Sequence, residues 1–194
     1  PEASPDAWPK LDALAGDPDY WDWLMPSSFA RPSPIVEAFA VELGLLRGDD
    51  PLATLTGLKV ALNRTIQYDR GSTRVDSPID ECIEKRRGVC QDFAHLFIAI
   101  SRGLGIPARY VSGYLFHREG DPDPTARDAT HAWAEAFIPG AGWVGFDPSN
   151  MTMTAERHIR VAIGRDYSDV PPNRGVFKGP AKEALHVHVE VERV

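Results

Sequence analysis

The sequence contains only two cysteines, Cys82 and Cys90, among its 194 residues, and it has no long apolar run. Two cysteines are too few for a disulfide scaffold, so we expect both to be free thiols in a reducing compartment. The longest apolar segment, residues 96–100, is far shorter than the roughly 18 residues of a membrane span. Residues 1–5 have neither the basic start nor the apolar core of a signal peptide. These absences predict a cytoplasmic protein that does not bind membranes.

Clustered positive charge is also absent. The chain carries 21 Lys and Arg residues against 28 Asp and Glu residues, and its densest basic run is only residues 85–87. Nucleic acids and anionic membranes reward clustered Lys and Arg, so we expect neither as a partner. The short basic run is typical of a helix C-terminus, where cations face the negative end of the helix dipole.

The first 34 residues are rich in proline, aspartate and serine, and they contain three tryptophans. This composition predicts an irregular arm that is held on the domain by its aromatic side chains. A Ser-Pro pair then begins a helix over residues 33–43, with the serine as N-cap. We assign residues 1–50 to an arm and first helix packing on the core, and residues 51–194 to the core of a single domain.

Helical periodicity continues to about residue 104. An Asp-Pro pair begins a second helix at residue 50, and a Ser-Pro pair begins a short third helix over residues 77–87. The strongest helix begins near Cys90. Its predicted buried face consists of Phe93, Leu96, Phe97, Ile100 and Leu104. Glycine and proline within residues 103–107 end this helix.

After this helix the apolar period changes from about 3.6 to 2, which is typical of strands. The predicted strands are residues 109–116, 130–138, 143–147, 158–163 and 184–194. The last of them alternates apolar and polar residues, so one face is expected to be buried and the other wet. Helices followed by antiparallel strands, without alternation of the two, predict an α+β fold. We expect N-terminal helices packed on a C-terminal antiparallel sheet.

Cys90 has the surroundings of a nucleophilic thiol. It follows a glycine-containing turn at the start of the long helix, where free backbone N–H groups and the helix dipole stabilise a thiolate. The same N–H groups can donate to an oxyanion during acyl transfer. A buried structural cysteine is the alternative, and it is the preferred interpretation for Cys82, which lies inside a short helix.

A thiol nucleophile needs a histidine base and an acceptor that orients it. His131 begins one predicted strand, and Asp147 ends the next after a Pro-Gly-Ala-Gly turn. If residues 139–141 form a three-residue loop, Asp147 lies opposite Trp133 and on the same face as His131. Such diagonal neighbours are roughly 7–8 Å apart at the backbone, which side chains can bridge. Taken alone, residues 147–150 would be interpreted as a turn.

Several further residues are weaker candidates for chemistry. His158 and Arg160 point out of a strand and could contact substrate, whereas His95 is expected to be a core or supporting histidine. The face shared by His186, His188 and Glu190 is interpreted as the wet side of a strand, because a fourth metal ligand is lacking.

The segment between residues 116 and 130 is interpreted as a solvated connection, with a lid over the cleft as the alternative. Its acidic spacing is similar to that of a calcium loop, but position twelve counted from Asp121 is Ala132 instead of glutamate. We therefore expect no metal and no cofactor.

Four segments together resemble one known family. Residues 88–94 (GVCQDFA) and 104–114 (LGIPARYVSGY) are similar to the core motifs of the transglutaminase-like superfamily. Residues 130–135 (THAWAE) and 142–150 (GWVGFDPSN) match its His and Asp motifs in the same order. The segment of residues 158–172 resembles the bacterial branch of transglutaminase-like cysteine proteases.

The resemblance implies a papain-like fold with a Cys90–His131–Asp147 triad, acting on a peptide or protein amide through a thioester. Hydrolysis is the expected outcome. Transfer of the acyl group to an amine, or a non-catalytic peptide-binding module, are the alternatives. Members of the bacterial branch often carry an upstream β-rich domain.

Three residues are further candidates for oxyanion or substrate contacts: Tyr68, Gln91 and Trp133. Tyr68 is expected either as the second oxyanion donor, beside the backbone N–H of Cys90, or as an ordinary packing aromatic. Gln91 is next to Cys90, but on a helix its side chain points about 100° away, which favours a supporting role.

Overall fold

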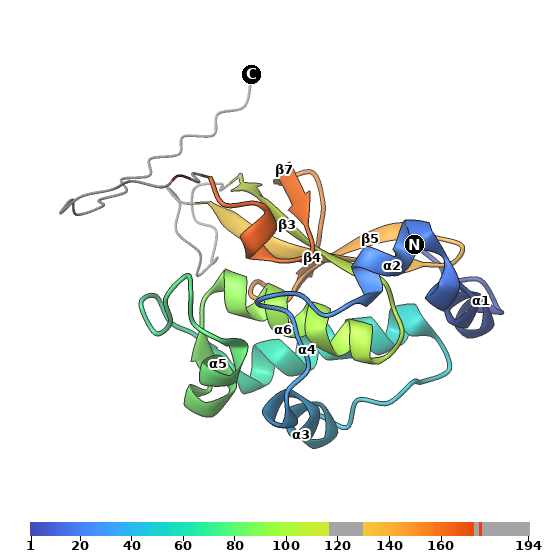
Figure 1. Cartoon of the computed structure of the whole chain (residues 1–194), viewed down its shortest axis with the longest axis horizontal. Helices are drawn as coiled ribbons and strands as arrows, with labels where there is room; N and C mark the ends of the chain where they lie inside the picture. The colour runs from blue at the N-terminus through green and yellow to red at the C-terminus, as the bar shows by residue number, and fades with distance from the viewer. Residues whose placement is uncertain (117–129, 173–174, 176–194) are drawn as a thin grey trace.

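The computed structural model describes residues 1–116, 130–172 and 175 of the chain. The helices that follow residue 33 form one layer, and an antiparallel sheet lies over them (Figure 1). Among the described residues the larger sheet has the strand order β6-β5-β4-β3-β7. Its strands are β3 (Ala108–Leu115), β4 (His131–Ile138), β5 (Gly142–Asp147), β6 (Thr152–Met153) and β7 (His158–Gly164). The predicted α+β fold is confirmed.

The four helices after residue 33 begin within a residue or two of their predicted starts. They are α3 (Pro34–Glu42), α4 (Pro51–Thr65), α5 (Ile79–Lys85) and α6 (Cys90–Gly103). Ser33 Oγ accepts a hydrogen bond from the backbone N–H of Val36 at 3.1 Å, and an Asp50 carboxylate oxygen accepts one from Leu52 at 2.9 Å. In both helices the proline occupies the first turn, where its missing N–H costs nothing.

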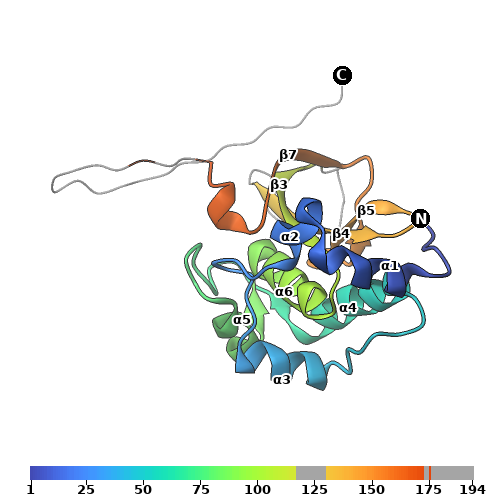
Figure 2. The same ribbon diagram turned by 45° about the vertical axis from the view of Figure 1, so that its right-hand side comes forward.

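Helix α6 is the centre of the core. It packs against β3 and β4 on one side and against α3, α4 and α5 on the other (Figures 1 and 2). Its predicted apolar face is buried from Phe93 to Ile100, whereas Leu104, the C-cap of the helix, is only partly buried. The alanines at alternate positions of β4 join the same core: Ala132, Ala134 and Ala136. Because these side chains are small, the helix can lie close to the strand. The larger residues of β4, which alternate with them, therefore point to the opposite face of the sheet.

The prediction of an irregular arm is wrong for residues 7–24. This segment forms α1 (Ala7–Ala13), a 3-10 turn η1 (Leu14–Gly16) and α2 (Pro18–Leu24). The aspartates and prolines that suggested irregular structure instead occupy helix-starting positions, since Asp17 caps α2 and Pro18 is its first residue. The expected aromatic anchoring is present.

Aromatic rings fix α2 to the sheet. The ring of Tyr20 lies 4.7 Å from that of Phe137, and Trp23 meets Trp143 edge-on at 6.0 Å. Both contacts are within the range of favourable aromatic pairs. Trp21 does not share this role, because it is 54% exposed.

A small parallel pair of strands was not predicted from the sequence. Strands β1 (Gln67–Tyr68) and β2 (Arg87–Gly88) have only two residues each, too few for a periodic pattern. Tyr68 pairs with Gly88. This pairing brings the end of α4 next to the turn that leads into Cys90.

The predicted hairpin register is confirmed. Ile138 pairs with Gly142, and Ala134 pairs with Phe146, so residues 139–141 form the loop. The predicted strand over residues 184–194, with His186 and His188, lies outside the described residues. So does nearly all of the connection between residues 116 and 130.

The large sheet is strongly curled. The side chain of His158 in β7 reaches Asp147 in β5 at 3.2 Å, although β3 and β4 lie between these strands. A register shift between Ser112 and Gly113 bends β3 where it pairs with β7. At Gly113 an added Cβ would lie 2.1 Å from the carbonyl oxygen of Ile159, so only glycine permits this approach. The curl gives the sheet a concave face that bears His131 and Trp133.

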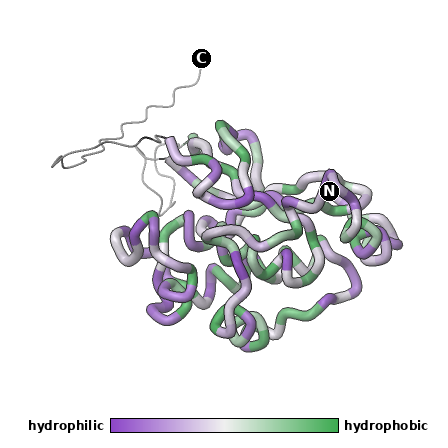
Figure 3. The backbone as a smooth tube through the Cα atoms, in the orientation of Figure 1, coloured by the Kyte–Doolittle hydropathy of each residue, from purple (hydrophilic) through white to green (hydrophobic). Residues whose placement is uncertain are grey.

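Hydrophobic and hydrophilic residues alternate along the described elements (Figure 3). None of the described helices is both long and apolar enough to span a bilayer.

Candidate active site

Cys90 is the first residue of α6 and is partly exposed. The carboxylate of Asp92 accepts hydrogen bonds from the backbone N–H of Val89 at 2.8 Å and from the Thr73 hydroxyl at 2.5 Å. Both bonds fix the turn before the cysteine. By helix geometry, the backbone N–H of Cys90 has no partner within α6, so it remains a donor for an incoming oxyanion.

Cys82 lies in a different environment. Its side chain is completely buried, and an added Cβ at Gly88 would lie 2.6 Å from its sulfur. Burial, together with the negative charges of Asp92 and Glu81, raises the pKa of Cys82 far above its ordinary value. Cys82 is therefore a structural thiol, as the sequence predicts.

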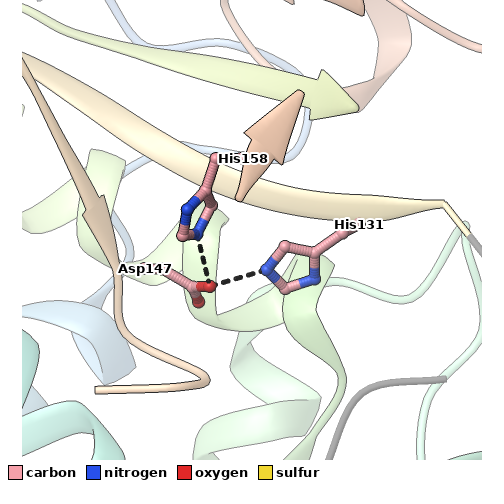
Figure 4. A group of neighbouring side chains, drawn as sticks. All are labelled: His131, Asp147 and His158. Atoms are coloured by element: carbon pink, nitrogen blue, oxygen red, sulfur yellow. Dashed lines mark hydrogen bonds and ion pairs between the residues drawn. The ribbon is translucent and has the colours of Figure 1, made fainter. Parts of the chain in front are cut away.

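His131 and Asp147 meet across the hairpin, as the predicted register requires. His131 Nε2 lies 2.7 Å from Asp147 Oδ2, and both side chains are at most 2% exposed (Figure 4). His131 Nδ1 is also buried and has no hydrogen-bond partner among the described residues. This free nitrogen leaves one side of the ring available for the thiol.

Five hydrogen-bond donors surround the Asp147 carboxylate. Oδ2 accepts hydrogen bonds from His131 Nε2, His158 Nε2 and Asn150 Nδ2. Oδ1 accepts hydrogen bonds from Ser149 Oγ and from the backbone N–H of Asn150. Burial alone would raise the pKa of Asp147. The positive charge of His131 and the bonds from His131, His158 and Ser149 instead hold this pKa far below its usual range. Asp147 is therefore a permanent anion.

The charge state of His131 follows from the same contacts. Burial alone would lower the pKa of His131, but the charge of Asp147, their hydrogen bond and the neighbouring Cys90 raise it to about 10. The imidazole therefore carries a proton at neutral pH. A protonated imidazole beside Cys90 stabilises a thiolate and can protonate a leaving amine.

Helix α4 contacts the turn that follows Asp147. Asn63 Nδ2 donates to the carbonyl oxygens of Pro148 at 2.8 Å and Ser149 at 3.0 Å. Lys59 is 7% exposed, and although burial lowers its pKa, the charge of Asp147 acts in the opposite direction. The turn after β5 is therefore held in place by α4, which helps to fix the position of Asp147.

The structure separates the three weaker candidates. Tyr68 lies beside Gly88 through the β1–β2 pair, with its ring 6.4 Å from that of Phe93, so it is near the nucleophile's turn. Gln91 donates to the backbone oxygen of Val75 at 2.9 Å and supports a neighbouring loop. Trp133 is 1% exposed on the concave face, which favours a packing role.

Two residues near the triad were not assigned to it from the sequence. From the sequence His158 was a weak candidate that could contact substrate, whereas in the structure its Nε2 is hydrogen-bonded to Asp147 and its side chain is 3% exposed. Tyr110 is also buried. Burial above all, and then the charge of Cys90, raise the pKa of Tyr110 well above its ordinary value, so it stays a neutral phenol. Nothing in the local sequence indicates that His158 bonds to Asp147, because this contact depends on how separate strands meet.

A pocket of about 270 Å³ lies on the concave face. Its lining consists of Trp133, Glu135, Thr154, Ala155, His158 and Arg160. Neither Cys90 nor Asp147 belongs to this described lining. Arg160 therefore belongs to a pocket that adjoins His158 and whose described lining does not include the thiol.

The cluster of His131, Asp147 and His158 offers three ligand atoms within 4.8 Å of one another, which is a donor set that zinc accepts. A metal-bound histidine normally donates its other N–H to an acceptor. His158 has the opposite polarity, since its Nδ1 accepts a hydrogen bond from the backbone N–H of Ala155 at 3.3 Å. The proton therefore resides on Nε2, where a metal would bind. We interpret the cluster as a hydrogen-bond network.

Comparison with known proteins places this geometry in a family. A family model described as "Transglutaminase-like superfamily" matches residues 45–148, a stretch that contains Cys90, His131 and Asp147. The chain belongs to this superfamily. An uncharacterised protein of Mycobacterium leprae is 33% identical over the whole chain, which spans 68% of that relative's length.

Two solved structures share the fold of this transglutaminase-like chain. A candidate cysteine protease from Cytophaga hutchinsonii superposes with a TM-score of 0.67 at 30% identity, over 82% of this chain and 51% of the other. The periplasmic domain of TgpA from Pseudomonas aeruginosa superposes with a TM-score of 0.53 at 28% identity, over 70% and 48%. The chain thus spans about half the length of these structures. Cytoplasmic location stays a prediction, since the TgpA domain is periplasmic.

Proposed function

We propose that this chain is a cysteine-dependent amide or peptide bond hydrolase that acts through a thioester on Cys90. The observation that carries the proposal is the arrangement of three residues from separate elements: a partly exposed thiol at a helix N-terminus, a protonated imidazole beside it, and a buried aspartate behind the imidazole. A module that only binds peptides has no chemical need for this set.

In the proposed reaction the Cys90 sulfur attacks the carbonyl carbon of an amide. The oxyanion that forms accepts a hydrogen bond from the backbone N–H of Cys90. His131 then transfers its proton to the departing nitrogen as the C–N bond breaks, which leaves a thioester and a neutral imidazole. Water, activated by His131, attacks the thioester and releases a carboxylic acid and the thiol. Asp147 holds the ring in place and stabilises its charged form throughout.

Acyl transfer differs from hydrolysis only in the last step, in which a primary amine replaces water. The family name favours this second candidate, because transglutaminases join a glutamine side chain to an amine. The triad serves both outcomes equally. The choice depends on how well water is excluded and an amine is bound, and a substrate experiment separates the two.

The test is incubation with a library of peptide amides, with and without a primary amine, followed by mass spectrometry of products and of the intact protein. Cys90→Ala should abolish turnover. Cys82→Ala is the matched control, because it removes the buried thiol and should leave turnover intact. Release of ammonia or peptide that ignores the amine indicates a hydrolase, and incorporation of the amine indicates a transferase. Turnover that survives Cys90→Ala, or an absence of turnover with every substrate, would contradict the proposal.

A further inference from the structure

His158 occupies a place that the proposed mechanism does not use. It lies on β7, on the far side of the sheet from β5, yet its Nε2 points at the same carboxylate oxygen of Asp147 as His131 does (Figure 4). The two histidine rings are 6.2 Å apart. Both are almost completely buried, at 3% or less of side-chain exposure.

The protonation of the His158 ring is fixed by its second nitrogen. The backbone N–H of Ala155 donates to Nδ1 at 3.3 Å, so Nδ1 must carry a lone pair and Nε2 must carry the proton. His158 is therefore a neutral donor toward Asp147. A Lys or Arg in this place would bring a second positive charge, which would compete with His131 for the carboxylate.

The other donors to Asp147 cannot hold it in the same way. Ser149 and Asn150 belong to the turn that follows β5, so they move with the aspartate. Among the described residues, His158 is the one donor besides His131 that comes from a separate strand. It therefore ties the carboxylate to the opposite side of the curled sheet and keeps Oδ2 directed at His131.

Trp133 packs against both histidines. Its ring lies 6.0 Å from that of His131, nearly parallel to it, and meets His158 edge-on at 5.2 Å. The indole is itself buried. The His158 ring is thus packed against Trp133 in the orientation in which its Nε2 reaches Asp147.

From these contacts we infer that His158 is a positioning residue of the site: its neutral Nε2–H fixes the Asp147 carboxylate so that His131 faces Cys90. This inference rests on the proposed function, because it concerns the same triad. It adds a fourth side chain whose effect on Cys90 passes through Asp147 and His131.

The variants that test this role are His158→Phe and His158→Gln. Phenylalanine keeps a ring against Trp133 but has no N–H. Glutamine places an amide N–H near the position of Nε2 and should restore the bond to Asp147. The matched control is Val161→Thr, a change of similar size on the same strand at a residue that is 60% exposed.

The primary measurement is the rate of Cys90 alkylation by iodoacetamide as a function of pH, in variants that circular dichroism shows to be folded. His158→Phe should slow alkylation at about pH 7 roughly tenfold, the effect of losing one hydrogen bond to a charged group. His158→Gln and Val161→Thr should stay near the wild-type rate. Proton NMR should show a slowly exchanging Nε2–H of His131 in the wild type and the glutamine variant, and faster exchange in the phenylalanine variant.

Two results would overturn the inference. One is a rate of Cys90 alkylation in His158→Phe that equals the wild-type rate at every pH. The other is alkylation of Cys90 in His158→Gln that is as slow as in His158→Phe, which would show that the N–H group has no effect. Both readouts are independent of substrate. If no amide is ever turned over but the alkylation pattern appears, the positioning role stands and the proposed function fails. If the wild type turns over substrate and His158→Phe matches it in turnover and alkylation, the function stands and the positioning role fails.

Discussion

Replacing Asp147 with asparagine changes the charge behind His131 while keeping the shape of the side chain. The carboxylate accepts five hydrogen bonds, three on Oδ2 and two on Oδ1. An amide group offers one oxygen, so in either orientation at least two buried donors face an NH₂ group. Each buried group without a partner costs about 1–3 kcal/mol, so we expect Asp147→Asn to lower the free energy of unfolding by about 2–5 kcal/mol.

The chemical consequence of Asp147→Asn should be larger than the structural one. Without the negative charge, burial dominates and the pKa of His131 falls from about 10 to below its ordinary value. His131 is then neutral at about pH 7, and Cys90 loses its cationic neighbour. We expect the rate of Cys90 alkylation at that pH to fall at least about a hundredfold, by analogy with the orienting aspartate of serine proteases.

A second buried aspartate separates these two effects. Asp166 is completely buried and accepts hydrogen bonds from the backbone N–H groups of Phe29 at 2.7 Å and Ser168 at 2.8 Å, but it has no contact with His131. Asp166→Asn should lower the urea-unfolding free energy and leave alkylation of Cys90 unchanged. Wild-type alkylation in Asp147→Asn, or an equal loss in Asp166→Asn, would show that the charge of Asp147 does not activate Cys90 through His131.

Three further changes have expected outcomes. Arg102→Met removes a buried guanidinium that bonds to Trp23, Ser27, Ala30, Ala108 and Arg165, and should cost about 2–4 kcal/mol in urea unfolding and speed proteolysis of the first 30 residues. Gly88→Ala, whose Cβ would lie 2.6 Å from the Cys82 sulfur, should cost about 1–3 kcal/mol and slow Cys90 alkylation; an unchanged variant would contradict the assigned packing. Burial lowers the pKa of His95 to about 3 in the folded protein. As the pH falls below about 6.5, His95 is therefore protonated in the unfolded chain but not in the folded one, and the free energy of unfolding decreases. His95→Gln keeps an acceptor for Tyr167 and should remove about 2 kcal/mol of the loss at about pH 5; parallel pH–stability curves would exclude this cause.

The parts of the fold that the sequence predicts are those with local causes. A Ser-Pro or Asp-Pro pair caps a helix by itself, so the starts of α3 and α4 were predictable from a few residues. The loop of residues 139–141 fixes the pairing of β4 with β5, and this register brings Asp147 to His131. The pairing of His131 with Asp147 was therefore predictable from spacing and turn chemistry.

The parts that the sequence does not predict depend on how distant segments meet. His158 reaches Asp147 only because the sheet curls, and that curl involves the shifted pairing at Gly113. Strands β1 and β2 are too short to leave a pattern. The arm was misjudged because proline and aspartate, which break helices in their interiors, favour helices at their first positions.

The proposed mechanism depends most directly on the activation of Cys90 by His131. Comparison with Cys82 does not test this, because burial alone protects that thiol. We would therefore measure iodoacetamide alkylation of Cys90 at about pH 6 in the wild type, with glutathione as an exposed, unactivated reference thiol and His131→Ala as the variant. We expect Cys90 to react more than about tenfold faster than glutathione, and His131→Ala to remove this excess. A Cys90 that reacts at the rate of glutathione, or as fast without His131, would contradict this mechanism.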